Sequence, residues 1–205
     1  MISKIFEDFV IYIITMDLIK TEKSALIVYN IKDKSDLIKA CVDDIDDQLL
    51  EYPPIIVYGK KLKQRRCVGF FSDTSEGYEY SGQTADSKPL TKNLKELLDF
   101  VNVKFKSKFN GILVNKYKDG KDYLSAHSDD ERHLDDCGVV SISYGATRKF
   151  RIRDMLNRIV MDVPTKTNQI IHMEGDFQKE FKHEIPVEKR VKDTRYSFTF
   201  RKHLK

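Results

Sequence analysis

The chain has 205 residues, of which 40% are hydrophobic, enough to bury one core but short for two. We therefore expect a single domain spanning residues 1–205, present as a monomer. The 36 basic and 32 acidic residues give a net charge of +4, which permits a polyanionic partner without requiring one.

The three cysteines suit a reducing compartment, because an odd number at these spacings forms neither a disulfide framework nor a cysteine metal site. They are Cys41, Cys67 and Cys137. The apolar-rich opening, Ile2 to Ile14, is interrupted by charged residues and predicts a core helix or strand rather than a signal peptide. No apolar run approaches the roughly 18 residues that a membrane span needs. We expect a soluble intracellular protein, cytoplasmic or nuclear, with no membrane partner.

Strand and helix signals alternate in the N-terminal section. Ala25 to Tyr29 predicts a strand, and Ser35 can cap a helix over Asp36 to Leu50, whose apolar residues recur at helical spacing. Two prolines end this helix, and Ile55 to Tyr58 predicts a further strand. A short amphipathic helix is expected later, over Lys92 to Phe100.

Between these helices lies a basic stretch followed by aromatic residues. Its members are Lys60, Lys61, Lys63, Arg65, Arg66, Phe70, Phe71, Tyr78 and Tyr80. Cations can neutralise phosphates and rings can stack on bases, so one interpretation is a nucleic-acid contact. The alternative is a solvated loop beside a core hairpin, and taken alone the stretch favours that alternative.

The second half of the chain consists of short alternating apolar and polar runs separated by turn residues. Strands are predicted over Ile112 to Tyr117, Val139 to Tyr144, Lys149 to Ile152, Ile159 to Val163, Gln169 to Met173 and Arg195 to Arg201. Many short strands without long helices between them indicate a barrel or double sheet. With the N-terminal α/β section before it, the fold class is α+β.

A metal site is suggested by His127-Ser128-Asp129, since residues two apart on a strand project to the same side. His183 supplies a third ligand if the strands bring it close. Two histidines and a carboxylate that leave other positions open are typical of Fe(II) oxygenases. Zinc chemistry on the same ligands is the competing reading, and the His-x-Asp motif alone also fits an exposed polar turn.

The last predicted strand places Arg195, Ser197 and Arg201 on one face, because side chains alternate with a period of two. Buried arginines need an anion, and a dicarboxylate cosubstrate would supply it. Asn115 and Tyr117 lie two apart on an earlier strand and can donate hydrogen bonds to carboxylate oxygens. A core aromatic beside a strand-end amide is the alternative for that pair.

Together these motifs resemble the AlkB-like dioxygenases, which remove alkyl groups from nucleic-acid bases. The resemblance runs from about Ser24 to Arg201 and is densest in Asn115-Lys116-Tyr117, in His127 to Glu131, in Ser143 to Arg148 and in Arg195 to Arg201. Tyr78 to Gly82 is similar to the family's substrate lid. The resemblance implies a double-stranded β-helix (jelly-roll) core over about 105–202, an N-terminal α/β section and a nucleotide-recognition lid over about 55–90.

The resemblance also implies roles for individual residues. The implied Fe(II) ligands are His127, Asp129 and His183. The implied 2-oxoglutarate-binding residues are Asn115, Tyr117, Arg195, Ser197 and Arg201. Arg195 would pair with the distal carboxylate, and Arg201 with Asn115 would face the metal-proximal one. Ser197 departs from the family, which more often has asparagine there, so one cosubstrate hydrogen bond would differ.

For the substrate, the resemblance implies that the target base stacks between His127 and Tyr80, with Tyr78 and Ser81 nearby, while Glu131 reads the base edge. The basic residues that would grip the nucleic acid are Lys60, Lys61, Arg65 and Arg66. With Fe(II), 2-oxoglutarate and O2, the implied reaction demethylates bases of the 1-methyladenine and 3-methylcytosine type in DNA or RNA and releases formaldehyde, succinate and CO2.

Two other functions remain open. One is the same iron chemistry on a protein or small-molecule substrate, and the other is a catalytically silent nucleic-acid-binding module. The lid shows no long hydrophobic wedge, which favours single-stranded or flexible substrates. The remaining histidines match no ligand position and are expected at the surface or at strand ends. They are His133, His172 and His203.

Overall fold

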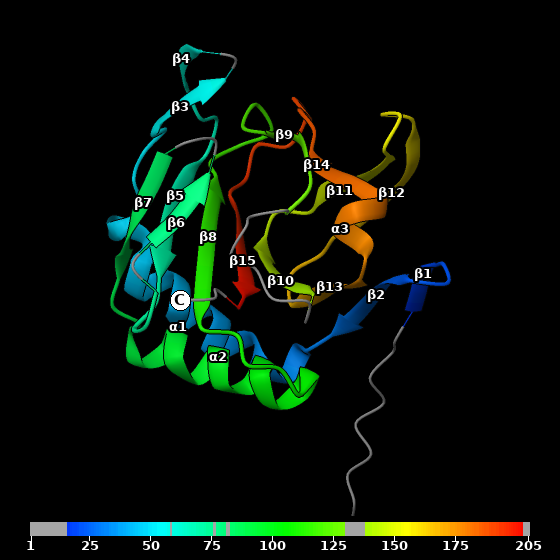
Figure 1. Ribbon diagram of the computed structural model, residues 1–205. Helices are drawn as coiled ribbons and strands as arrows, with labels where there is room; N and C mark the ends of the chain where they lie inside the picture. Colours follow the sequence, from blue (N-terminus) through cyan, green and yellow to red (C-terminus); the bar gives the residue numbers. More distant parts are fainter. Residues whose placement is uncertain (1–15, 58, 76, 81–82, 130–137, 203–205) are drawn as a thin grey trace, which may run out of the picture.

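The computed structural model of the chain describes residues 16–57, 59–75, 77–80, 83–129 and 138–202. The element expected in Ile2 to Ile14 lies outside these ranges. Within them, the chain forms a large sheet, a smaller sheet opposite it, and a separate hairpin (Figure 1). None of the helices in this part of the chain has the length and apolar character required to cross a membrane.

The large sheet has nine strands in the order β1-β2-β13-β10-β15-β8-β5-β7-β6. Their bounds are Met16–Lys20 (β1), Ser24–Asn30 (β2), Cys67–Phe71 (β5), Gly77–Tyr80 (β6), Gln83–Lys88 (β7), Gly111–Tyr117 (β8), Val139–Gly145 (β10), Gln169–Gly175 (β13) and Arg195–Arg201 (β15). Strands β5 and β7 pair in parallel and the other neighbours are antiparallel. The centre of this sheet is therefore assembled from segments far apart in sequence.

Two helices cover one face of the large sheet. They are α1 (Ser35–Ile45) and α2 (Lys92–Phe105), and their buried apolar residues pack against those of β15, such as Phe198 and Phe200. Helix α1 ends earlier than predicted and passes into a 3-10 turn, η2 (Asp46–Gln48), whereas a one-turn 3-10 helix, η1 (Lys32–Lys34), precedes it. Helix α2 extends to Phe105 and begins at a Thr91 cap, whose side chain accepts a hydrogen bond from Leu94 N at 3.1 Å.

The smaller sheet has the order β12-β11-β14-β9 and lies against the other face of the large one. Its strands are β9 (Leu124–His127), β11 (Arg148–Asp154), β12 (Ile159–Thr165) and β14 (Phe181–Ile185), with a single-turn helix, α3 (Phe177–Glu180), before β14. Apolar side chains from both sheets, including Tyr117, Phe150 and Met173, form one core between them. This is the double-stranded β-helix that the resemblance implied.

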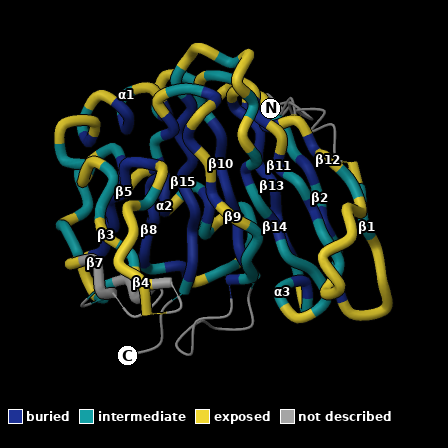
Figure 2. The backbone as a smooth tube through the Cα atoms, turned by 90° about the horizontal axis from the view of Figure 1, so that it is seen from above, coloured by how far each residue is buried: buried dark blue, intermediate teal, exposed yellow. Residues whose placement is uncertain are grey.

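Strands β8, β10, β13 and β15 are buried along most of their length (Figure 2). Helices cover one face of these strands and the smaller sheet covers the other. Side chains that point to either face of the large sheet are therefore buried. Polar side chains on the strands must then find partners within the protein. This arrangement places the charged residues of β15 in the interior.

The hairpin comprises β3 (Pro54–Val57) and β4 (Lys60–Lys63), and it stands away from the two sheets (Figure 1). All four residues of β4 are exposed. Strand β5 follows immediately and is buried throughout in the large sheet. The range expected to form the lid thus combines a projecting hairpin, a core strand and the β6–β7 edge of the sheet.

Candidate active site

The pairing of two short strands brings the three candidate metal ligands together. His127 ends β9 and lies opposite His183 of β14 in the strand register, and Asp129 follows two residues later. His127 Nε2 is 3.5 Å from Asp129 Oδ1, and His183 Nε2 is 3.8 Å from Asp129 Oδ2. One ligand atom from each residue lies within 4.8 Å of the others, a spacing that suits a single metal ion.

The protonation states of these groups suit a cation. Burial would raise the pKa of Asp129, but Arg201, His183 and His127 outweigh it and hold that pKa well below its usual range. Burial, reinforced by His127, lowers the pKa of His183 to about 3. At neutral pH the site therefore combines a carboxylate with a neutral His183 imidazole, the forms that bind metals.

Hydrogen bonds orient the ligands. His127 Nδ1 lies 2.9 Å from the carbonyl oxygen of Ser125, so the other ring nitrogen, Nε2, is the one that faces Asp129. Arg201 Nη2 donates to Asp129 Oδ1 at 2.6 Å, and the Asp129 backbone N–H donates to Gln178 Oε1 at 2.8 Å. Asp129 Oδ2 is buried without a hydrogen bond among the described residues, which fits an oxygen that binds a divalent cation.

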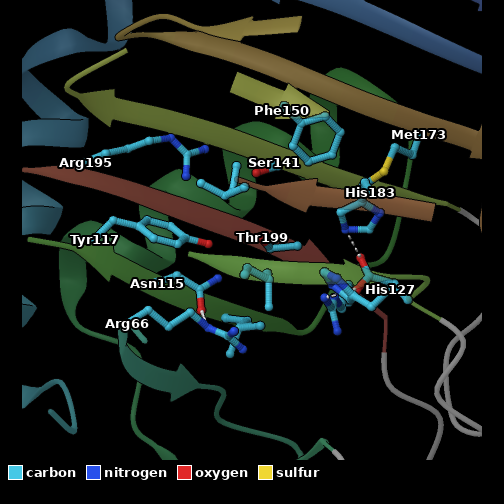
Figure 3. Close-up of a pocket in the computed structure, with 15 residues that line it drawn as sticks. Arg66, Asn115, Tyr117, His127, Ser141, Phe150, Met173, His183, Arg195 and Thr199 are labelled. Atoms are coloured by element: carbon cyan, nitrogen blue, oxygen red, sulfur yellow. Dashed lines mark hydrogen bonds and ion pairs between the residues drawn. The ribbon is translucent and has the colours of Figure 1, made fainter. Parts of the chain in front are cut away.

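Beside the ligands, Arg195 points into the same pocket (Figure 3). It is 2% exposed, and its Nη2 donates to Ser143 Oγ at 2.9 Å. Its Nε and Nη1 are buried and make no hydrogen bond to any residue that the structure describes. Burial lowers the pKa of Arg195 to about 10, so the guanidinium stays charged at neutral pH. A buried cation with unused donors fits a carboxylate ligand.

Strand register places three of the other predicted cosubstrate residues near Arg195. Arg195 lies opposite Tyr117, and Ser197 opposite Asn115, across the β15–β8 pair. Asn115 Oδ1 accepts a hydrogen bond from Arg66 Nε at 2.8 Å, which leaves the amide N–H groups of Asn115 as donors toward the pocket. Ser197 is buried but does not line the pocket, unlike its strand neighbour Thr199.

Arg66 was predicted to grip nucleic acid together with Lys60, Lys61 and Arg65, but unlike those three residues it is buried. Its side chain is 3% exposed and lines the pocket together with Asn115 and Arg201. Its position directly before the apolar run Cys67–Phe71 could have indicated an arginine at the entrance to a buried strand. Local sequence does not reveal the partner, because Asn115 lies on another strand.

Two further contacts to the metal ligands were not predicted. The ring of Phe150 stacks on His183, with centroids 5.0 Å apart and an interplanar angle of 22°. Gln178, on α3, binds the backbone of Asp129, and its Nε2 donates to Met173 Sδ at 3.4 Å. The sequence around Phe150 and Gln178 does not indicate these contacts, because each contact joins two elements that are distant in sequence and meet only in the folded protein.

The predicted nucleic-acid contacts are more dispersed. Lys60 and Lys61 are exposed on β4, and Arg65 is exposed with its guanidinium carbon 5.5 Å from the Tyr52 ring centroid. Two apolar residues of the hairpin are also exposed, Ile56 at 44% and Leu62 at 51%. The structure describes Tyr78 and Tyr80 only as positions on β6, and Ser81 and Glu131 lie outside the described residues.

His172 was expected at the surface or a strand end, and this is wrong. It is 6% exposed within β13, and its ring centroid lies 4.5 Å from that of Phe105. Burial lowers its pKa to about 4, although Glu174 Oε1 lies 3.0 Å from its Nδ1. His133 and His203 lie outside the described residues.

Known proteins resemble this chain in both sequence and structure. A model described as the 2OG-Fe(II) oxygenase superfamily matches residues 27–201. The human DNA oxidative demethylase ALKBH2 is 32% identical over 157 residues, which are 72% of this chain and 60% of that protein. The rat alpha-ketoglutarate-dependent dioxygenase alkB homolog 3 is 36% identical over 103 residues, 45% of this chain and 35% of that one.

The solved structure of OsALKBH1 shares the fold, with a TM-score of 0.57 at 18% identity over 90% of this chain and 99% of that one. The ALKBH2 proteins of human, cattle and mouse are matched over 56% to 66% of their own length. The family model covers most of this chain and includes all three candidate metal ligands. The chain therefore belongs to the 2OG-Fe(II) oxygenase superfamily and is AlkB-like within it.

Proposed function

We propose that this protein is an Fe(II)- and 2-oxoglutarate-dependent dioxygenase that oxidatively demethylates alkylated bases in DNA or RNA. The products would be the repaired base, formaldehyde, succinate and CO2. The observation that carries the proposal is the juxtaposition, in one pocket, of the His127, Asp129 and His183 ligand atoms with the unused donors of Arg195. The names of the ALKBH2 relatives support the nucleic-acid substrate.

The proposal assigns a role to the metal ligands and to the two arginines of β15. Fe(II) with 2-oxoglutarate and O2 would supply the oxidising power needed to hydroxylate an N-methyl group. His127, Asp129 and His183 hold the metal, and Arg201 keeps Asp129 ionised and oriented. Arg195 binds the distal carboxylate of the cosubstrate. A hydroxylated N-methyl group then loses formaldehyde without further help from the protein.

The Asn115 amide and the Tyr117 phenol add hydrogen bonds to the cosubstrate from the neighbouring strand. Buried as they are, at 4% and 1% exposed, both side chains are held in fixed positions. Ser197 does not line the pocket, so it would support cosubstrate binding indirectly, by its place on β15 between Arg195 and Arg201. Such preorganisation keeps the reacting groups aligned without further ordering when the ligands bind.

On the substrate side, we propose that a lid over about 55–90 presents the target base. Lys60, Lys61 and Arg65 would neutralise phosphates, because they are exposed on or beside a projecting hairpin. Tyr78, Tyr80, Ser81 and Glu131 would surround the base, with lesions of the 1-methyladenine and 3-methylcytosine type as targets. The protein would act as a monomer, in the cytoplasm or the nucleus, where nucleic acid is present.

The deciding experiment offers an oligonucleotide carrying 1-methyladenine to the protein with Fe(II), 2-oxoglutarate and ascorbate. Repaired base and formaldehyde are measured for the native chain and for Asp129→Ala. Asp99→Ala serves as the matched control, since Asp99 is exposed on α2. We expect turnover in the native chain and the control and none in Asp129→Ala.

The alternative substrate class is a protein or small molecule that undergoes the same iron chemistry. The same experiment separates the two, because succinate measures cosubstrate turnover independently of base repair. Succinate without repair of any methylated base would overturn the nucleic-acid substrate while keeping the dioxygenase. Equal turnover by Asp129→Ala and the native chain would overturn the metal site.

A further inference from the structure

Arg148 is a buried arginine that does not line the pocket. It begins β11, is 1% exposed and is among the largest side chains with almost no solvent contact. The family resemblance includes its motif, Ser143 to Arg148, but gives the arginine no task. A buried guanidinium is stable only when its N–H groups are paired, so the partners of Arg148 show what it holds in place.

Two loops meet at Arg148, and each connects one half of the site to the other. Residues 118–123 join β8, which carries Asn115 and Tyr117, to β9, which carries His127. Residues 186–194 join β14, which carries His183, to β15, which carries Arg195. Both loops therefore link a strand with a metal ligand to a strand with cosubstrate-binding residues.

The guanidinium of Arg148 binds both loops at once. In the first loop, Nη1 donates to the carbonyl oxygen of Asp119 at 2.9 Å and Nη2 to that of Asp122 at 2.9 Å. In the second, Nη2 donates to the carbonyl oxygen of Pro186 at 2.7 Å and Nε to Glu188 Oε2 at 3.1 Å. One side chain thus fixes the two connections relative to β11.

The loops also contact each other at this point. Gly120 N donates to the carbonyl oxygen of Val191 at 3.0 Å, and Glu188 N donates to that of Gly120 at 2.7 Å. A Cβ on Gly120 would lie 1.9 Å from the Glu188 carbonyl oxygen, so only glycine permits this approach. Close backbone packing and the arginine together make the junction rigid.

The same guanidinium lies close to the cosubstrate residues. Its carbon atom is 5.8 Å from the centroid of the Tyr117 ring, and the guanidinium carbon of Arg195 is 5.3 Å from that centroid. The two histidine ligands, in contrast, already lie opposite each other in the β9–β14 register, and Asp129 follows His127 by two residues. Loss of Arg148 would therefore disturb the relation between the two half-sites more than the metal half-site itself.

We propose that Arg148 is a positioning residue that sets the spacing between the metal ligands and the 2-oxoglutarate-binding residues. A dicarboxylate that contacts both half-sites binds tightly only when their separation is fixed. The proposal rests on the assignment of the pocket as a metal and 2-oxoglutarate site, and it does not depend on the nucleic-acid substrate.

The test compares the native chain with Arg148→Lys, which keeps the charge but cannot form the planar fork of bonds. Binding of Mn(II) alone, binding of 2-oxoglutarate to the Mn(II)-loaded protein, and the thermal midpoint are measured. We expect 2-oxoglutarate affinity to fall by about 10- to 100-fold, with Mn(II) affinity nearly unchanged. Leu97→Ala, in the fully buried core of α2, is the control that lowers stability without changing either affinity.

Glu188→Ala provides the same test if Arg148→Lys does not fold, because it removes one partner of the guanidinium from a partly exposed position. Asp193→Ala, an exposed carboxylate in the same loop, is its matched control. We expect 2-oxoglutarate affinity to fall on the order of tenfold in Glu188→Ala and not in the control.

The outcomes separate this inference from the site assignment. Folded Arg148→Lys and Glu188→Ala proteins that bind 2-oxoglutarate as the native chain does would overturn the positioning role alone. A parallel loss of Mn(II) and 2-oxoglutarate affinity would also overturn it, since that result indicates general damage to the barrel. A native chain that binds Mn(II) but no 2-oxoglutarate would overturn the assignment of the pocket.

Discussion

The pocket and the β3–β4 hairpin both carry clustered cationic residues, yet the two regions are built in opposite ways. In the pocket, Arg195 and Arg201 are 2% and 3% exposed. Both lie on β15, which pairs with β10 on one side and β8 on the other. On the hairpin, Lys60 and Lys61 are exposed on a two-stranded sheet that, within the described residues, pairs with no other strand. Buried charges are held in fixed geometry, whereas exposed ones act mainly through their field.

The two regions can therefore provide different kinds of specificity. A rigid pocket of fixed donors can select one small dicarboxylate, because any mismatch leaves a buried charge unpaired. An exposed basic hairpin attracts any polyanion and loses affinity as salt rises. We therefore expect substitutions in the pocket to change cosubstrate binding and those on the hairpin to change the salt dependence of nucleic-acid binding.

The largest effect is expected for Arg195→Met, which removes the cation assigned to the distal carboxylate. Truncating one partner of a buried charge pair costs about 2–5 kcal/mol, so 2-oxoglutarate affinity should fall roughly 30- to 4,000-fold. Titration of the Mn(II)-loaded protein with 2-oxoglutarate measures this. Arg158→Met, at a largely exposed arginine of the β11–β12 turn, is the control. Unchanged binding in Arg195→Met would show that the anion site lies elsewhere.

Arg66→Met tests whether Arg66 supports cosubstrate binding in the pocket or nucleic-acid binding by the lid. Because its Nε binds Asn115 inside the pocket, we expect a loss of 2-oxoglutarate affinity corresponding to about 1.5–3 kcal/mol, or roughly 10- to 150-fold. The salt dependence of nucleic-acid binding should stay at the native slope. The reverse pattern, with intact cosubstrate binding and a shallower salt slope, would return Arg66 to the lid.

His172 offers a pH test on the face of the sheet that the helices cover. Its pKa is about 4 in the folded protein and near 6.5 when unfolded, so the unfolded chain binds the extra proton. The resulting stability is fully present above about pH 6.5 and is lost as pH falls toward 4. Urea unfolding at pH 7.5 and pH 5 should show a decrease on the order of 1–2 kcal/mol that His172→Leu reduces. An identical decrease in the variant would assign the effect to other groups.

The smallest effect on the chemistry is expected from neutralising the hairpin. The triple variant Lys60→Gln, Lys61→Gln, Arg65→Gln should weaken nucleic-acid binding and reduce the slope of log affinity against log salt by about one per phosphate contact removed. Cosubstrate affinity should remain native. Lys92→Gln, Lys95→Gln and Lys106→Gln, on or just after α2, form a charge-matched control. Equal salt slopes in both variants would remove the hairpin from the nucleic-acid contact.

Local periodicity indicated which candidate site residues share a face of a strand, whereas their roles came from the family resemblance. His127 with Asp129, and Arg195 with Arg201, are separated by even numbers of residues in extended segments, so the sequence assigns each pair to one face of a strand. The six strands predicted in the second half correspond to β8, β10, β11, β12, β13 and β15. These features follow from steric alternation along the chain, which does not depend on the rest of the fold.

Contacts between distant segments of the chain could not be read from local sequence, because they depend on how the strands pair and pack. The β9–β14 pair that joins His127 to His183 involves two short strands whose sequences carry no strong alternation. Arg66 and His172 were misplaced for the same reason, since a period of two shows which residues share a face but not what covers it. Burial depends on the helices and sheets that pack above a strand, and these come from the whole chain.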